Sequence, residues 1–151
     1  MSDDALDEMM ANFARAAVEL ARDFHVQLDF TEESLEQVEA ILAQLHQQLR
    51  TWGVGKSSPE PCPNAEQIDS MCKLWGGYFG EVVRRRWGGD WALEPYPGRN
   101  FSTLVLNVRA GKLFPTMKVY RRLTEGHEDN LWEFYQTLRK KMEASPGEKV
   151  Q

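Results

Sequence analysis

The stretch from Trp75 to Trp91 constrains the fold more than any other part of this chain. It reads Trp-Gly-Gly-Tyr-Phe-Gly-Glu-Val-Val-Arg-Arg-Arg-Trp-Gly-Gly-Asp-Trp and forms much of a helix predicted over residues 65–87, together with its exit. A glycine in the interior of a helix costs about 1 kcal/mol relative to alanine. The three glycines in the first half of the stretch therefore require either close packing of another backbone or room for a bound group.

Two of these glycines, Gly76 and Gly80, are four residues apart and so share one face of the helix. This spacing lets a second backbone approach closely. We expect the second helix of the chain, or a strand over residues 102–108, to lie on this face. A leucine at position 80 should then overpack the fold and cost about 1–3 kcal/mol.

Apolar residues that recur every three or four positions predict helices on both sides of this stretch. The first is predicted over residues 4–24, and the second runs from an N-cap at Thr31 to Trp52. The connection between them is short, which favours an antiparallel hairpin of helices. A further helix is predicted to begin at Pro115, and the last one spans residues 129–144.

Between the third helix and Pro115 the pattern changes to the alternation typical of strands. Residues 90–93 and 102–108 are predicted strands, and Ala110-Gly111 is a predicted hairpin turn. The expected fold class is therefore α+β, with an N-terminal helical hairpin, a glycine-rich third helix, a small antiparallel sheet and C-terminal helices.

The length of 151 residues fits one domain. Residues 1–30 are expected to form the N-terminal helix and its connection, packed as one unit with a main α+β domain over residues 31–144. The segment 53–63 is rich in proline and glycine and is predicted to be a surface loop. Residues 145–151 are expected to be a flexible tail.

The charge pattern narrows the function classes. The net charge of −5 argues against a protein whose main task is to bind nucleic acid. Residues 1–50 carry a net charge of −8 and residues 51–151 a net charge of +3. This asymmetry indicates either complementary packing of an acidic and a basic layer, or an acidic face that docks a basic partner. Neither a secretion signal nor an apolar run of membrane-spanning length is found, so a cytoplasmic location is expected.

No segment has a convincing catalytic or metal-binding pattern. Gly53–Ser57 is similar to a phosphate-binding loop, but the first glycine of that motif is replaced by Arg50, inside a helix rather than after a strand. Cys62, Cys72 and the three histidines lack the spacing of metal ligands. We therefore predict no catalytic residue, no metal ion and no cofactor, and an enzymatic role is left open only at Glu81.

Glu81 has two competing interpretations. It could be a general base in a glycine-lined pocket, where desolvation would raise its pKa. Alternatively, it could pair with Arg84 or Arg85 and orient Trp91, which is favoured because buried carboxylates are more often paired than catalytic. The candidate ligand-binding residues under the first interpretation are Gly77, Tyr78, Gly80, Glu81 and Trp91.

A basic and aromatic cluster follows Glu81. The candidate partner-binding residues are Arg84, Arg85, Arg86, Trp87, Arg121 and Arg122. Arginine and tryptophan are enriched among the residues that dominate protein interfaces, and such clusters can also hold phosphates and stack bases. The structural alternative is that one arginine pairs with Glu81 while the others cover apolar surface with their aliphatic stems.

Several short motifs occur in an order that carries a resemblance. They are Gly77-x-x-Gly80-Glu-Val, Gly88-Gly-x-Trp91, Phe114-Pro-x-x-Lys118-Val, Arg122-Leu, Gly126, and Leu131 with Phe134-Tyr135. In this order the chain, over about residues 30–140, resembles a group of uncharacterised bacterial domains of unknown function. The resemblance implies a small cytoplasmic bacterial α+β domain in which the Gly-Glu-Val helix and the Gly-Gly-x-Trp turn share one packed corner. It implies no catalytic role for any residue.

The sequence thus favours a non-enzymatic protein-interaction module, such as an adaptor, a regulatory subunit or an immunity-like protein. Its expected partner is a protein, without membrane association, and a homodimer is left open. The alternative is a small-molecule-binding protein or an enzyme with a pocket around Glu81. A weaker alternative is RNA binding through Arg84–Trp87.

Overall fold

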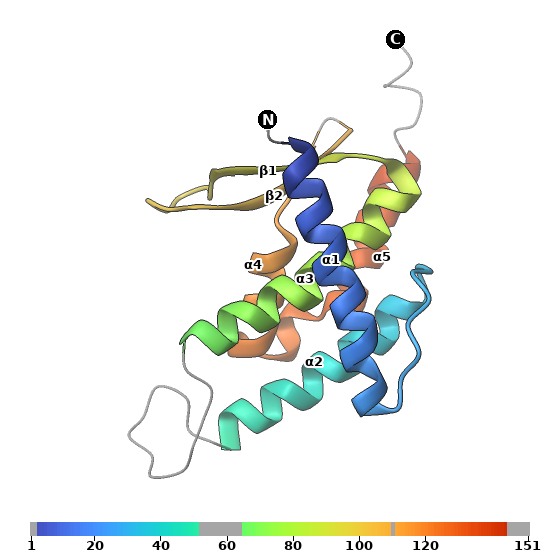
Figure 1. Cartoon of the computed structure of the whole chain (residues 1–151), viewed down its shortest axis with the longest axis vertical. Coiled ribbons are helices and arrows are strands. Elements are labelled where there is room, and N and C mark those ends of the chain that lie inside the picture. The colour runs from blue at the N-terminus through green and yellow to red at the C-terminus, as the bar shows by residue number, and fades with distance from the viewer. Residues whose placement is uncertain (1–2, 52–64, 110, 145–151) are drawn as a thin grey trace.

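A computed structural model describes residues 3–51, 65–109 and 111–144. As predicted, the fold is α+β, with helices at both ends of the chain and a small antiparallel sheet (Figure 1). The α-helices are α1 (Asp3–Ala21), α2 (Ser34–Thr51), α3 (Ala65–Trp87), α4 (Pro115–Glu125) and α5 (Leu131–Ala144). The strands are β1 (Asp90–Pro95), β2 (Ser102–Val108) and β3 (Gly111–Leu113), and single 3-10 turns occur at Arg22–Phe24 and His127–Asp129.

Helix α3 has the predicted bounds, whereas α2 begins at Ser34, two residues after the first helical position expected from an N-cap at Thr31. Thr31 still caps α2, because its Oγ1 accepts a hydrogen bond from the backbone N–H of Ser34 at 3.2 Å. The connection before it contains two residues with positive φ, His25 and Phe30. These left-handed conformations turn the chain between the first two helices.

The first two helices follow each other closely in the sequence, but each packs mainly against other elements. Helix α1 lies across α3 and contacts β1, whereas α2 packs against α4 and α5 (Figure 1). The helix α3 is therefore the central element, and its C-terminal half is buried continuously from Trp75 to Val83.

The glycine face of α3 is covered by other elements than the sequence suggested. A Cβ atom on Gly76 would lie 2.7 Å from Thr116 Cα, and one on Gly80 would lie 2.3 Å from the Trp91 ring and 3.3 Å from Pro115. The expectation that the second helix or the 102–108 strand would lie there is therefore wrong. Strand β3 ends at Leu113, and α4 begins directly afterwards at Pro115. The position of the sheet therefore places the first turn of α4 against α3.

The sheet has the order β1-β2-β3, and its apolar face extends past the core. Trp91 pairs with Leu106, and both side chains are completely buried. Two residues further along the same face, Leu93 pairs with Leu104 but is 63% exposed. The hairpin of β1 and β2 therefore projects to one side of the helices (Figure 1).

Some sequence predictions concern residues outside the described parts of the chain: the loop 53–63 with its Gly53–Ser57 segment and Cys62, and the tail 145–151. Within the described residues, no group of three or more His, Cys, Asp and Glu side chains could hold a metal ion. No described helix combines the length and the apolar character that crossing a membrane requires.

Candidate functional site

Glu81 lies at a corner where α1, α3 and β1 meet. Its Oε2 accepts a hydrogen bond of 2.8 Å from the indole N–H of Trp91, and its Oε1 is 3.5 Å from a guanidinium nitrogen of Arg84. Asp7 of α1 completes the network, because it accepts hydrogen bonds of 3.1 Å from both Arg84 and the backbone N–H of Trp91. Both oxygens of Glu81 thus face partners within the fold, as the structural interpretation requires.

Atoms of neighbouring elements occupy the space beside the two glycines of the candidate ligand site. A Cβ atom on Gly77 would lie 3.0 Å from Phe13 Cβ and 3.3 Å from the carbonyl oxygen of Met10, both on α1. Gly80 adjoins the ring of Trp91 on another side of α3. These glycines therefore allow close packing of neighbouring elements against α3.

Tyr78, the remaining member of that candidate site, points toward the segment before α2. Its hydroxyl accepts a hydrogen bond of 2.7 Å from the backbone N–H of Phe30 and shares one of 2.6 Å with Ser34 Oγ. Burial raises the pKa of Tyr78 above its ordinary value. The structure thus brings Gly80, Glu81 and Trp91 together but turns Gly77 and Tyr78 toward different neighbours.

The arginines at the end of α3 contact groups within the same chain. Arg84 belongs to the corner around Glu81, and the guanidinium of Arg85 lies 3.7 Å from the centroid of the Phe30 ring. Arg86 is 3.5 Å from a carboxylate oxygen of Glu32. Two of the three charges are therefore paired, although Arg85 and Arg86 remain exposed to solvent.

The other candidate partner-binding residues have their own neighbours. The ring of Trp87 packs near Tyr135 of α5, with centroids 5.9 Å apart. Arg121 and Arg122 belong to α4 and contact residues other than the Arg84–Trp87 group. Adjacent residues on a helix point about 100° apart, so Arg121 faces outward while Arg122 is only 3% exposed.

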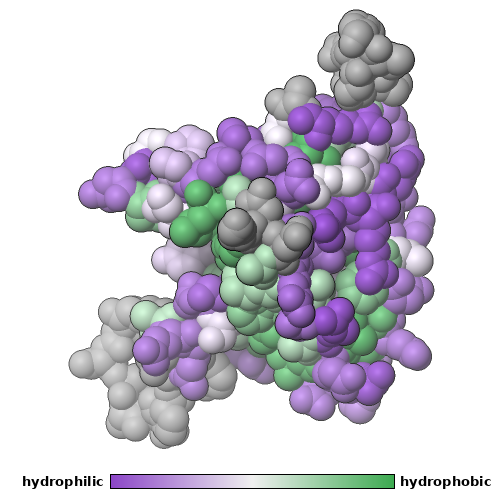
Figure 2. All heavy atoms as spheres, turned by 45° about the horizontal axis from the view of Figure 1, so that its top comes forward, coloured by the Kyte–Doolittle hydropathy of each residue, from purple (hydrophilic) through white to green (hydrophobic). Residues whose placement is uncertain are grey.

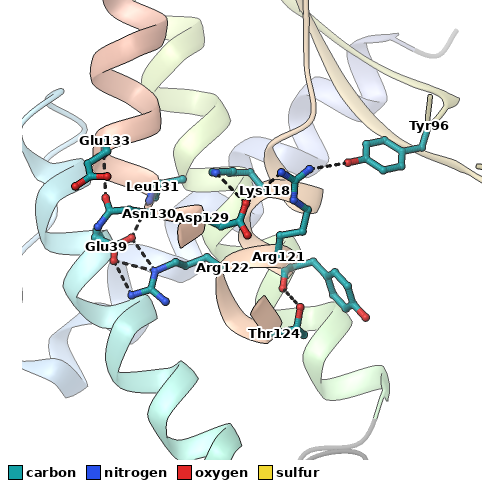
Figure 3. Close-up of polar contacts among 11 residues, drawn as sticks. Glu39, Tyr96, Lys118, Arg121, Arg122, Thr124, Asp129, Asn130, Leu131 and Glu133 are labelled. Carbon is teal, nitrogen blue, oxygen red and sulfur yellow. Dashed lines mark hydrogen bonds and ion pairs between the residues drawn. The ribbon is translucent and has the colours of Figure 1, made fainter. Parts of the chain in front are cut away.

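Arg122 is held by a buried carboxylate (Figure 3). Glu39 reaches from α2 and places an oxygen 2.8 Å from Arg122 Nη2. The same carboxylate accepts a hydrogen bond of 2.8 Å from the backbone N–H of Leu131, at the beginning of α5. One carboxylate therefore joins α2, α4 and α5, and its negative charge suits the N-terminal end of the α5 dipole.

Arg121 points in the other direction, toward the hairpin (Figure 3). Its guanidinium donates to the hydroxyl of Tyr96 at 3.2 Å and to Asp129 at 3.1 Å. Lys118 lies 3.4 Å from the same carboxylate of Asp129. Burial lowers the pKa of Lys118, and Asp129 partly opposes this shift by favouring the charged form.

The hairpin, the first half of α3 and α4 enclose an open cleft of about 950 Å³. Figure 2 shows it as an indentation at the left edge of the molecule, below the projecting hairpin. Its walls comprise Ala65, Ile68, Asp69, Cys72, Lys73, Leu93, Tyr96, Arg99, Phe101, Ser102, Thr103, Leu104, Thr116, Met117, Tyr120, Arg121, Glu125 and Asp129. None of the five candidate ligand-binding residues belongs to these walls.

Exposed apolar side chains gather at this cleft. Among the described residues, four large hydrophobic side chains are substantially exposed, and all except Met9 line it. Leu93 and Phe101 come from the hairpin, with exposures of 63% and 41%, and Tyr120 comes from α4, with 43%. Clusters of this kind, bordered by polar residues, mark interaction sites or ligand-binding grooves.

Contacts within the hairpin, and between the hairpin and α4, hold the cleft open. The ring of Tyr96 stacks on Phe101 with centroids 5.8 Å apart and meets Phe114 edge-on at 5.1 Å. The hydroxyl of Tyr96 accepts the hydrogen bond from Arg121 described above, which joins the hairpin to α4. The cleft is therefore preformed, which reduces the entropy lost when a ligand or partner binds.

The chemistry of the walls suits binding better than reaction. Cys72 lines the cleft, but burial raises its pKa to about 12. The thiol is therefore protonated near neutral pH and a weak nucleophile. Apolar and aromatic groups with a few polar ones are the usual composition of a binding groove.

Sequence reasoning selected only Arg121 from the walls of this cleft. The available signal was the placement of Tyr96 and Phe101 in a turn rich in proline and glycine, where large aromatic side chains have no core to join. Tyr120 also departs from the buried stripe of α4. These residues become a site only when the hairpin and α4 are brought together.

Comparison with known proteins found no matching family model, no matching curated protein and no matching solved structure.

Proposed function

We propose that this protein is a non-enzymatic interaction module, such as an adaptor, a regulatory subunit or an immunity-like protein, that binds a protein partner through the cleft. The observation that carries this proposal is the exposure of Leu93, Phe101 and Tyr120 on walls contributed by separate elements. Aromatic and aliphatic side chains that enter a pocket supply most of the binding energy at protein interfaces.

Two further features support a binding role. The carboxylate of Glu81 is already engaged by Trp91 and Arg84, so a catalytic role there would require the corner to open. The ion pairs of Arg84 and Arg86 reduce the charge that an RNA backbone could use. The proposal includes a cytoplasmic location in a bacterium, as the resemblance to uncharacterised bacterial domains implies.

A second candidate is a small-molecule-binding protein. Its support comes from the volume of the cleft, about 950 Å³, which lies within the range of ligand pockets of roughly 300–1,000 Å³. A metabolite retained during native purification, and lost in the Leu93→Asp variant, would favour this candidate over a protein partner.

Site-specific photo-crosslinking in the native cells tests the main proposal. The photoreactive residue p-benzoylphenylalanine replaces Phe101 or Tyr120 in the cleft, or the exposed Arg22 as a control. We expect the same protein to be crosslinked from both cleft positions and not from position 22, and the yield to fall when Leu93→Asp is added. Absence of a product specific to the cleft would contradict the proposal.

A further inference from the structure

Six charged residues line the cleft, and four of them form ion pairs with one another. On α3, Lys73 Nζ is 3.0 Å from a carboxylate oxygen of Asp69. On the opposite wall, Arg121 is 3.1 Å from Asp129. The two charges within each pair cancel, so these four residues give the cleft no net charge.

The remaining two charged residues of the cleft are Arg99 and Glu125. Arg99 is exposed in the turn between β1 and β2, and Glu125 is the exposed last residue of α4. Neither side chain has a hydrogen bond or an ion pair in the described part of the chain. The cleft therefore offers a cation on the hairpin and an anion at the end of α4, and neither is paired with another group among the described residues.

We propose that the cleft binds a peptide segment of the partner that carries apolar residues between an acidic and a basic residue. The acidic residue lies beside Arg99, and the basic residue lies beside Glu125. This inference rests on the interaction function proposed above and adds the chemistry of the partner.

Each feature of the cleft has a role in this mode of binding. The apolar residues of the segment cover Leu93, Phe101 and Tyr120, which supplies most of the affinity. The two charges at the rim determine direction, because a segment bound in reverse would place like charges beside Arg99 and Glu125. The cleft thus distinguishes partners by the order of their charges.

A second copy of this chain fits the cleft less well. The chain has a net charge of −5, so two copies repel each other over the distance at which they would first meet. A short segment with one charge of each sign meets no such repulsion.

Selection from a displayed library of random peptides on the immobilised full-length protein tests this inference. We expect enriched peptides to carry apolar or aromatic residues between an Asp or Glu and a Lys or Arg. The double variant Arg99→Glu/Glu125→Arg keeps the net charge and should enrich peptides with the opposite order of charges. The matched control, Glu19→Arg/Arg22→Glu, exchanges an exposed ion pair on another surface and should leave the enriched order unchanged.

One enriched peptide, labelled with a fluorophore, then gives affinities for single variants. Arg99→Glu and Glu125→Arg should each weaken binding about fivefold, whereas Arg99→Lys should retain it. Leu93→Asp should abolish binding. Circular dichroism confirms that each variant is folded.

The outcomes separate this inference from the proposed function. Binding that is lost in Leu93→Asp but unchanged by both charge reversals would overturn the inference and leave the interaction function standing. Failure to enrich any peptide that depends on Leu93 would count against both. A dimer in sedimentation equilibrium that dissociates in Leu93→Asp would assign the cleft to a second copy and also overturn the inference.

Discussion

Buried carboxylates connect distant parts of this chain at the scale of single residues. Glu39 joins α2 to Arg122 on α4 and to the first N–H of α5. Glu81 joins α3 to the indole of Trp91 on β1. Each carboxylate is stable in the interior because its partners compensate the loss of hydration.

Replacing Glu39 with glutamine should destabilise the fold strongly. The guanidinium of Arg122 is 3% exposed and would be left buried without its counter-charge. We expect a loss of about 3 kcal/mol in the free energy of unfolding, measured by urea denaturation. Glu36→Gln on the exposed face of the same helix is the control and should change stability by less than about 0.5 kcal/mol. Equal effects of the two substitutions would contradict the importance of the buried pair.

Replacing Gly80 with alanine should also destabilise the fold, although alanine favours helices. The added Cβ would lie 2.3 Å from the Trp91 ring, which is itself held by Glu81 and cannot move freely. We expect a cost of about 1–3 kcal/mol in urea denaturation. Gly111→Ala is the matched control, because its nearest atom would be 3.9 Å away. A Gly80→Ala variant as stable as the parent protein would show that the corner is loosely packed.

At the scale of elements, the side chain of Asp7 joins α1 to the edge of the sheet. Asp7 accepts hydrogen bonds from the backbone N–H of Trp91 and from Arg84. The backbone N–H of Trp91 points away from β2, toward α1, so Asp7 also caps the free edge of β1. An edge protected in this way is less prone to pair with strands of other molecules.

Asp7→Ala should loosen this edge without unfolding the core. We expect the Trp91 amide to exchange hydrogen faster, and the free energy of unfolding to fall by about 1–3 kcal/mol, because two donors lose their acceptor. Hydrogen exchange followed by NMR measures the first effect. Glu8→Ala, an exposed neighbour on α1, is the control. Unchanged exchange at Trp91 would mean that Asp7 does not hold the edge in solution.

At the scale of the whole molecule, stability should decline at alkaline pH. Burial raises the pKa of Cys72 to about 12 and also raises those of Tyr78 and Tyr135. The unfolded chain therefore releases these protons first, and unfolding is favoured as pH rises above about 8.5 for the cysteine and about 10 for the tyrosines. Burial lowers the pKa of Lys118, so this one group has the opposite effect: its contribution favours the folded state as pH rises.

Urea midpoints between pH 8 and about 11 test this expectation. The midpoint should fall progressively, and in Cys72→Ala the part of the decline that begins near pH 8.5 should be smaller. The comparison concerns how steeply the urea midpoint changes with pH. A constant loss of stability caused by the substitution itself therefore does not affect it. A midpoint that is constant up to pH 10 would contradict the assigned burial.

Local patterns were sufficient to predict most elements. Helix α3 occupies the predicted residues, Thr31 caps α2 and Pro115 opens α4, because periodicity, capping and proline geometry act within a few residues. The glycines of α3 correctly indicated close packing. They did not indicate that α4 and Trp91 would cover them, because that depends on how the sheet leads into α4.

The sequence by itself therefore determined the α+β class, the elements and the need for close approach at α3, since each of these follows from interactions between neighbouring residues. Only the tertiary structure decided that Arg121 reaches the hairpin while Arg122 is buried against Glu39. It alone also produced the cleft, whose walls come from α3, the β1–β2 hairpin and α4. Such a site depends on the relative placement of segments that are distant in sequence, and no local pattern encodes that placement.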